Sequence, residues 1–173
     1  IRTLHLIWNQ KKENNETTIF QQKLIDESSV IENIAEVIRI ESEGEKKSTS
    51  PLLKELILFL RDLAFSRKTA FHICRSGCID TLVHVLIKTN DFTDKIVNVL
   101  RLLTESTETD DKRKGAIFEL SKEVTFSTLC RCLKDLLING FRRSDKELRN
   151  EVLILLATLL SRTENHVRFM QNN

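Results

Sequence analysis

Two stretches that resemble each other decide the fold: AFHICRSGCIDTLVHVL at residues 70–86 and AIFELSKEVTFSTLCRCL at residues 116–133. Each has a short segment with an aromatic residue, then a polar corner, then a longer aliphatic segment. A third copy, TIFQQKLIDESSVIENIAEVI, lies earlier at residues 18–38. The copies recur every 45 to 50 residues or so, a period typical of proteins built from stacked units of two or three helices.

The aliphatic residues follow the three-and-four spacing of helices that bury one face. Each copy is preceded by another predicted helix, and so is a final short segment at 165–170. These four helices are expected at Leu4–Trp8, Leu52–Leu63, Ile96–Leu103 and Leu148–Leu160. The chain has only four Gly and one Pro, whereas an all-β sandwich or barrel needs many turn residues. The sequence therefore predicts an all-α protein.

Four local signals predict where helices begin and end. Ser50-Pro51 is typical of a helix start with proline at the first helical position. Gly77 is placed to end the short helix before it in a left-handed conformation, and Gly140 to end the helix that begins near Thr125. Ser144-Asp-Lys-Glu147 has the pattern of a capping box that starts the next helix.

These signals predict one armadillo/HEAT-type α-solenoid segment over residues 1–173, with about three and a half three-helix repeats. The approximate units are 1–41, 51–90, 94–140 and 144–173. One such unit cannot bury both faces of its helices, so neighbouring units stack into a continuous core. A compact, non-repeating helical bundle is the alternative architecture.

Charge and hydropathy disfavour nucleic-acid and membrane partners. The 27 basic and 25 acidic residues leave a net charge of +2, which gives no extended field for an anionic partner. The densest basic spots, Lys112–Lys114 and Arg142-Arg143, lack interleaved aromatic residues for base stacking, which favours solvated corners. The longest aliphatic run, Val152–Leu160, is too short for a transmembrane helix.

The N-terminus and the cysteines bear on the compartment. The chain begins at Ile1 and shows no signal peptide, so we expect a segment of something longer. Four cysteines without the spacing of a disulfide framework, in a domain large enough for its own core, predict reduced thiols and an intracellular, cytoplasmic location.

The sequence gives no pattern for a metal, a cofactor or catalysis. Cys74 falls on an apolar helix face, and Cys130 and Cys132 lie about 200° apart around a helix axis, so the two cannot converge on one ion. There is no glycine-rich phosphate loop, no His-Glu-x-x-His and no Gly-x-Ser-x-Gly, and the four histidines are scattered. We expect a non-enzymatic protein without a small-molecule substrate.

Residues 75–86, RSGCIDTLVHVL, resemble the armadillo signature of a small turn residue, an aliphatic position and a Leu-Val-x-x-Leu helix. SRTENHVRFMQNN at 161–173 resembles the corner that leads toward that signature. The resemblance to the armadillo-like superfamily implies a binding protein, because this family acts almost entirely through protein contacts.

A narrower resemblance covers LKDLLINGF at 133–141 and DKELRNEVL at 145–153. These residues look like the armadillo-like cilia- and flagella-associated protein family numbered sixty-nine, and a weaker collinear likeness extends back through 71–86. The resemblance implies a structural subunit of a central-pair projection in the axoneme of motile cilia, packed against other projection proteins.

Helix capping does not account for five residues near the last predicted corner: Phe141, Arg142, Arg143, Arg149 and Asn150. We expect them to form a partner contact or a clamp between repeats. Other candidates lie on the third helix of each unit and are predicted to face a concave groove: Glu32, Asn33 and Glu36, then His84 and Lys88, then Thr128, Arg131 and Asp135.

The groove candidates are of mixed charge, and the tryptophan and asparagine ladder of nuclear-import armadillo proteins is absent. Trp8 lies on a first helix and is followed four residues later by Lys12. Three alternative interpretations therefore stay open. The chain is a soluble adaptor that binds peptides in its groove, or these residues form a plain solvated face, or the chain is a helical lobe of a larger enzyme.

Overall fold

The computed structural model describes residues 29–43, 50–89, 91–109, 111, 113–140 and 145–171. These residues form helices joined by turns, and no strand occurs among them, so the all-α prediction is confirmed. The expected helix at Leu4–Trp8, the copy at 18–28 and the candidates Phe141, Arg142 and Arg143 lie outside the described residues.

Most of the described residues belong to α-helices. The helices, in chain order, are α3 (Ser29–Glu43), α4 (Pro51–Ala64), α5 (Arg67–Arg75), α6 (Cys78–Lys88), α7 (Thr93–Ser106), α8 (Gly115–Leu120), α9 (Glu123–Asp135), α10 (Lys146–Leu160) and α11 (Thr163–Gln171). A π-helical turn, η1 (Leu136–Gly140), follows α9 directly.

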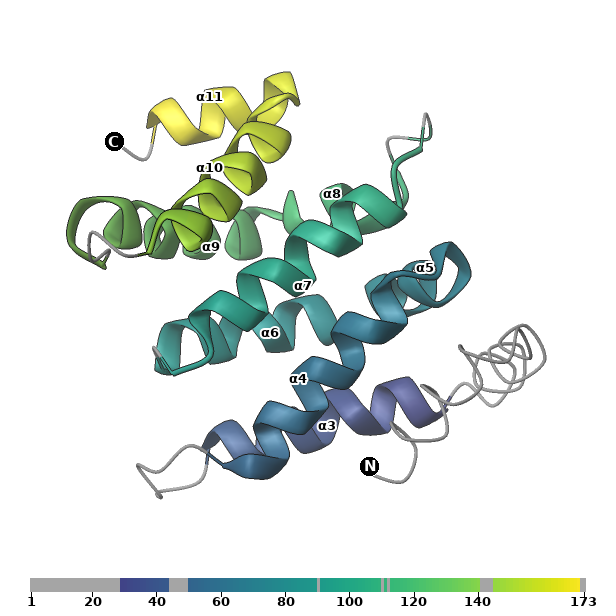
Figure 1. The fold of residues 1–173 in the computed structure, drawn as a ribbon. Coiled ribbons are helices and arrows are strands. Elements are labelled where there is room, and N and C mark those ends of the chain that lie inside the picture. The colour runs from purple at the N-terminus through teal and green to yellow at the C-terminus, as the bar shows by residue number, and fades with distance from the viewer. Residues whose placement is uncertain are drawn as a thin grey trace.

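The helices pack in three rows. Helix α7 lies between α4 and α10 in the first row, and these three cross the molecule one above another in Figure 1. Helix α6 lies between α3 and α9 in a second row, and α5 packs on α8 in a third. Helix α11 packs on α10 and α9 at the C-terminal end.

The core runs along the first row. Its buried positions match from helix to helix: Leu56, Ile57, Phe59, Leu60 and Leu63 on α4; Ile96, Val97, Val99, Leu100 and Leu103 on α7; Val152, Leu155, Leu156 and Leu159 on α10. Each of these side chains contributes about 1.5–3 kcal/mol through removal of apolar area from water. The three-and-four spacing is what places such residues on one stripe of each helix.

The corners confirm two of the predicted signals and correct a third. Ser50 caps α4 by accepting a hydrogen bond from the Leu53 backbone N–H at 3.4 Å, and Pro51 is the first helical residue. Gly77 has φ 78° and joins α5 to α6. The capping-box prediction at the start of α10 is wrong in its register: Asp145 is the N-cap residue, without a side-chain cap bond, and Ser144 lies outside the described residues.

The prediction that Gly140 ends its helix in a left-handed conformation is not confirmed. The chain widens into η1, so Gly140 is the last residue of a π-helical turn. Of the described glycines, Gly77 and Gly115 have the left-handed φ angle. A π-helical turn closes i→i+5 hydrogen bonds in place of the i→i+4 bonds of an α-helix, so the helix ends in a widened turn rather than at a left-handed glycine.

Within the described ranges, no helix by itself is both long enough and apolar enough to cross a bilayer, and α5 and α6 meet those criteria only as a pair bent by 73°.

Candidate functional site

The groove candidates of the second row lie on α3, α6 and α9. Seven of them are exposed: Glu32, Asn33, Glu36, His84, Lys88, Arg131 and Asp135. Thr128 is half-buried. Because α6 packs between α3 and α9, their exposed side chains belong to one continuous row of helices, which we call the α3–α6–α9 face. These residues carry both signs of charge, so the face suits a mixed polar partner better than a highly charged one.

Ion pairs within α3 modify the acidic end of this face. Arg39 binds Glu36 at 2.6 Å and Glu43 at 3.2 Å. The hydrogen bond from Arg39 lowers the pKa of Glu36, and the two carboxylates in turn raise the pKa of Arg39. Glu36 therefore stays ionised, and much of its charge is balanced within its own helix.

One pair joins α3 to α5 beside the candidate Glu32. His72 Nε2 lies 3.5 Å from Glu32 Oε1, too far for a well-aligned hydrogen bond. The Nε2 atom is buried and has no hydrogen-bond partner in the described part of the chain. Glu32 and His72 therefore bring α3 and α5 together without a hydrogen bond between them.

The remaining candidates lie elsewhere. Arg149 and Asn150 are exposed on α10, in the first row, and so are not part of the α3–α6–α9 face. Their prediction as a partner contact or a clamp stays a prediction.

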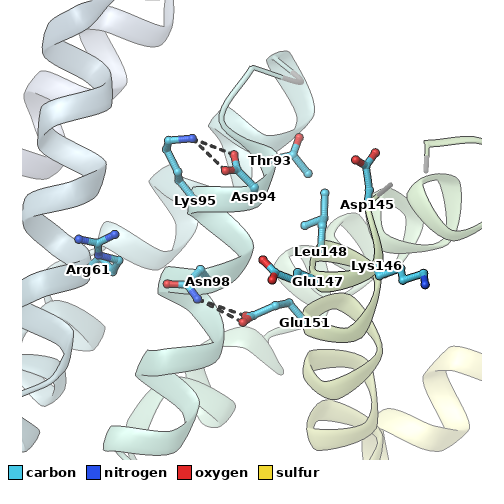
Figure 2. Close-up of a pocket in the computed structure, with 10 residues that line it drawn as sticks. All are labelled: Arg61, Thr93, Asp94, Lys95, Asn98, Asp145, Lys146, Glu147, Leu148 and Glu151. Atoms are coloured by element: carbon cyan, nitrogen blue, oxygen red, sulfur yellow. Dashed lines mark hydrogen bonds and ion pairs between the residues drawn. The ribbon is translucent and has the colours of Figure 1, made fainter. Parts of the chain in front are cut away.

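A groove that the sequence did not suggest runs between α4, α7 and α10. It has a volume of about 820 Å³, and Figure 2 shows the side chains that line it: Arg61, Thr93, Asp94, Lys95, Asn98, Asp145, Lys146, Glu147, Leu148 and Glu151. Basic and acidic side chains both line this groove. Two of them, Arg61 and Asp145, are more than eighty positions apart in the sequence. Periodicity gives no signal for it, because the groove depends on how the three helices pack.

A polar network fixes one wall of this groove. Arg101 Nε donates to Glu151 Oε2 at 2.6 Å. Asn98 Nδ2 lies 3.3 Å from both carboxylate oxygens of Glu151, as the dashed lines in Figure 2 show. Arg101 also pairs with Glu105 on its own helix. Burial by itself would lower the pKa of Arg101, but the hydrogen bonds to Glu151 and Glu105 raise it. We call Asn98, Arg101 and Glu151 the α7–α10 clamp.

A second network holds α11 against the corner between α8 and α9. Asn165 is fully buried, and its Nδ2 donates to Ser121 Oγ at 2.7 Å and to the Leu159 carbonyl at 2.9 Å. Arg168 donates to the Ser121 carbonyl at 2.6 Å. Both side chains satisfy groups at helix ends, where backbone partners run out. A lone asparagine in a polar stretch gave no sequence signal for this role.

The thiols are the remaining chemically distinctive groups. Burial raises the pKa of Cys74 to about 12, and raises the pKa of Cys78 and of Cys130 to about 11. Burial also raises the pKa of the half-buried Cys132. Thiolates are the form that attacks and that binds metals, so these cysteines are present as neutral, packed side chains at neutral pH.

Metal ligands do not gather among the residues that the structure describes, since no group of three or more His, Cys, Asp or Glu is arranged to hold an ion. In comparisons with protein-family models, curated proteins and solved structures, nothing matched this chain.

Proposed function

We propose that this chain is an armadillo-type solenoid segment that acts as a non-catalytic protein–protein scaffold, and that it is a structural subunit of the axonemal central apparatus. The row packing carries the first part of this proposal. Helices α4, α7 and α10 stack in series, as do α3, α6 and α9. Serial stacking of matched helices is how solenoids build extended binding surfaces.

The α3–α6–α9 face is the surface that we assign to partner binding. It presents exposed charged residues from each of its three helices, among them Glu36, Lys88 and Arg131. A surface with both signs of charge sets the register and the choice of a partner more than it sets raw affinity. Such selectivity suits a subunit that occupies one place in an assembly.

The ciliary assignment rests on the resemblance of residues 133–141 and 145–153, which include η1 and the first half of α10. An adaptor that binds peptides transiently on the same face is the second candidate. The long contact between Glu32 and His72 favours that candidate, because a partner that draws the exposed Glu32 carboxylate away breaks no hydrogen bond.

The test uses a motile-ciliated cell in which the endogenous protein is replaced by tagged variants. Axonemes are isolated, the central apparatus is separated from the outer doublets, and the tagged protein is quantified in each fraction. We expect the wild-type protein in the central-apparatus fraction. Its absence from axonemes would contradict the ciliary assignment and favour the adaptor.

Charge reversal tests the assigned face. The double variant Lys88→Glu with Arg131→Glu should deplete the protein from that fraction at least fivefold, because both side chains are exposed on the α3–α6–α9 face. The matched control is Lys54→Glu with Arg75→Glu, which makes the same charge change at exposed positions on α4 and α5. Equal retention of both double variants would show that the face is not the contact.

A further inference from the structure

Two neighbouring interfaces of the first row have matched core positions but different charges. The buried positions make Arg61 of α4 the counterpart of Arg101 on α7, since each directly follows a buried leucine. They also make Lys95 of α7 the counterpart of Glu151 on α10, since each directly precedes a buried β-branched residue. In the α7–α10 interface Arg101 binds Glu151. The same place in the α4–α7 interface has two cations, Arg61 and Lys95.

Both cations line the groove between α4, α7 and α10, and each turns to a carboxylate beside it in the sequence. Arg61 Nε and Nη2 donate to Asp62 Oδ1 at 3.1 and 3.0 Å. Lys95 Nζ donates to Asp94 Oδ1 and Oδ2 at 3.1 and 2.9 Å (Figure 2). Adjacent residues project from a helix about 100° apart and do not face each other, so such pairs hold a cation weakly. Among the residues that the structure describes, no carboxylate across the α4–α7 interface pairs with Arg61 or Lys95.

We propose that this groove binds an extended segment of a partner protein, and that a carboxylate of the segment lies between Arg61 and Lys95. The carboxylate has the role there that Glu151 has beside Arg101 in the α7–α10 clamp. The side chains of Arg61 and Lys95 are 39% and 27% exposed, so water screens them less than it screens fully exposed groups. A carboxylate between them accepts hydrogen bonds from two charged donors and separates two like charges.

The polarity of the walls argues for a peptide rather than a small molecule. Sites for small molecules are mostly apolar, whereas Leu148 is the one aliphatic side chain among the described residues that line this groove. The α10 wall also presents the exposed carboxylate of Glu147. Packed helices lie about 8–10 Å apart, and an extended chain advances about 3.3 Å per residue, so a basic residue about three positions from the acidic one reaches Glu147.

The same wall disfavours a phosphate as the anion. Glu147 and Glu151 both line the groove, and Asp94 lies beside Lys95. A phosphate group carries nearly two negative charges at neutral pH, and neighbouring carboxylates repel it. A carboxylate carries a single charge, and Glu151 shows that the first row accommodates one beside an arginine.

This inference goes beyond the proposed function, because the groove lies on other helices than the α3–α6–α9 face and the ciliary assignment does not require it. The probe is a fluorescein-labelled peptide, Gly-Ser-Glu-Ala-Ala-Lys-Ser-Gly, which has an acidic and a basic residue at the required spacing. Two further versions have glutamine or phosphoserine in place of the glutamate. Fluorescence anisotropy measures the binding of each peptide to the full chain at low salt.

We expect the glutamate peptide to bind saturably, and at least tenfold more tightly than either of the other two versions. Added salt should weaken this binding, because charged groups on an open groove are screened.

Variants of Lys95 test whether the two cations form the site. Lys95→Glu places a carboxylate of the chain itself opposite Arg61, so it should weaken binding of the glutamate peptide at least tenfold and raise the urea midpoint. Lys95→Gln should weaken binding without raising the midpoint. Lys54→Glu is the matched control, because it makes the same charge change at an exposed position of α4 outside the groove, and it should leave binding unchanged. Circular dichroism confirms that each variant keeps its helices.

Three results would overturn the proposal. The first is no binding of the glutamate peptide, including the case in which the chain self-associates in sedimentation equilibrium and Lys95→Glu abolishes that association, since a second copy is then the occupant. The second is binding that Lys95→Glu does not weaken. The third is tighter binding of the phosphoserine version, which would assign the groove to phosphorylated partners.

The proposed function and this inference can fail separately. The double variant Lys88→Glu with Arg131→Glu lies outside the groove and should leave peptide binding unchanged. Absence of the protein from axonemes with intact peptide binding would therefore refute the ciliary function alone. Normal retention in axonemes without peptide binding would refute this inference alone.

Discussion

Gly115 occupies a position where both the backbone angle and the surroundings require glycine. It has φ 81°, and a Cβ atom built on it would lie 2.7 Å from the Thr107 carbonyl oxygen and 2.9 Å from Thr107 Oγ1. The same Thr107 hydroxyl donates to the Leu103 carbonyl at 2.6 Å and accepts from the Ala116 backbone N–H at 2.8 Å. One threonine therefore ties the end of α7 to the start of α8, and glycine is needed to let the two segments approach.

Replacing this glycine gives the first prediction. Gly115→Ala should lower the free energy of unfolding by about 2–3 kcal/mol, because a left-handed φ angle and a steric clash add together. Gly77→Ala is the matched control: Gly77 has φ 78°, but a Cβ atom there meets nothing within 4 Å, so about 1 kcal/mol is expected. Urea denaturation followed by circular dichroism measures both, and equal losses would contradict the close approach at Thr107.

The thiols give a second prediction at the residue scale. At pH 8, Cys132 should react first with a disulfide reagent, and the buried Cys74, Cys78 and Cys130 should react at rates set by unfolding, because burial raises their pKa values to about 11–12. Timed mass spectrometry after alkylation identifies each site. Labelling of Cys74 before Cys132 would contradict this order.

The raised pKa values of the thiols also make the free energy of unfolding depend on pH. A thiol whose pKa is higher in the folded than in the unfolded chain stabilises the fold fully below the unfolded value, which is roughly 8.5 for an ordinary cysteine. That contribution is lost as the pH rises toward the folded values of about 11 to 12. Stability should therefore decline through this alkaline range.

At the scale of elements, an ion pair between two helices is expected to stabilise the fold more than an exposed ion pair within one helix. The α7–α10 clamp places a half-buried arginine and carboxylate 2.6 Å apart between helices whose contacting residues are 50 positions apart in sequence. By contrast, the pair between Arg39 and Glu36 is exposed and lies within one helix. Exposed pairs contribute little because water screens them and their side chains must be ordered.

A double-mutant cycle measures this difference. Arg101→Ala and Glu151→Ala should show a coupling of about 1 kcal/mol, reduced in 0.5 M salt, since the pair is hydrogen-bonded and only partly exposed. The matched cycle at Arg39 and Glu36 should show a smaller coupling. If the two couplings are equal, the clamp does not hold α10 on α7.

At the scale of the whole molecule, the position of a helix in its row decides how much its core residues contribute. Leu103 on α7 and Leu159 on α10 are counterparts, and both are fully buried. Helix α7 has α4 on one side and α10 on the other, whereas α10 has a first-row neighbour, α7, on one side only among the residues that the structure describes. A cavity at Leu103 is thus enclosed by more of the structure.

Leu103→Ala should lower the free energy of unfolding by about 4 kcal/mol, and Leu159→Ala by about 2–3 kcal/mol, because an end helix can relax around a cavity more fully. Guanidinium denaturation checks this, with the midpoint as the measure if the transition is not two-state. A larger loss at Leu159 would show that the stability of the molecule is not concentrated at its centre.

Much of the helical organisation was predictable from local pattern. The stripe of Leu52–Leu63 predicted α4, Ser50-Pro51 predicted where it starts, and Gly77 predicted the corner before α6. The start of α10 was placed one residue early, because Ser144 and Asp145 are both good capping residues and only packing decides between them. The armadillo type and the ciliary role stay proposals.

What the sequence by itself determined is therefore the helical class and the approximate position of most described helices, since periodicity and capping act between residues a few positions apart. Only the tertiary structure decided that Thr107 requires Gly115, that Asn165 and Arg168 serve Ser121, and that Glu151 meets Arg101. It also decided that Leu153 is exposed while Val97 is buried. The physical reason is that these contacts depend on which helix covers which face, and the local pattern of apolar residues is the same whether the covering helix is present or not.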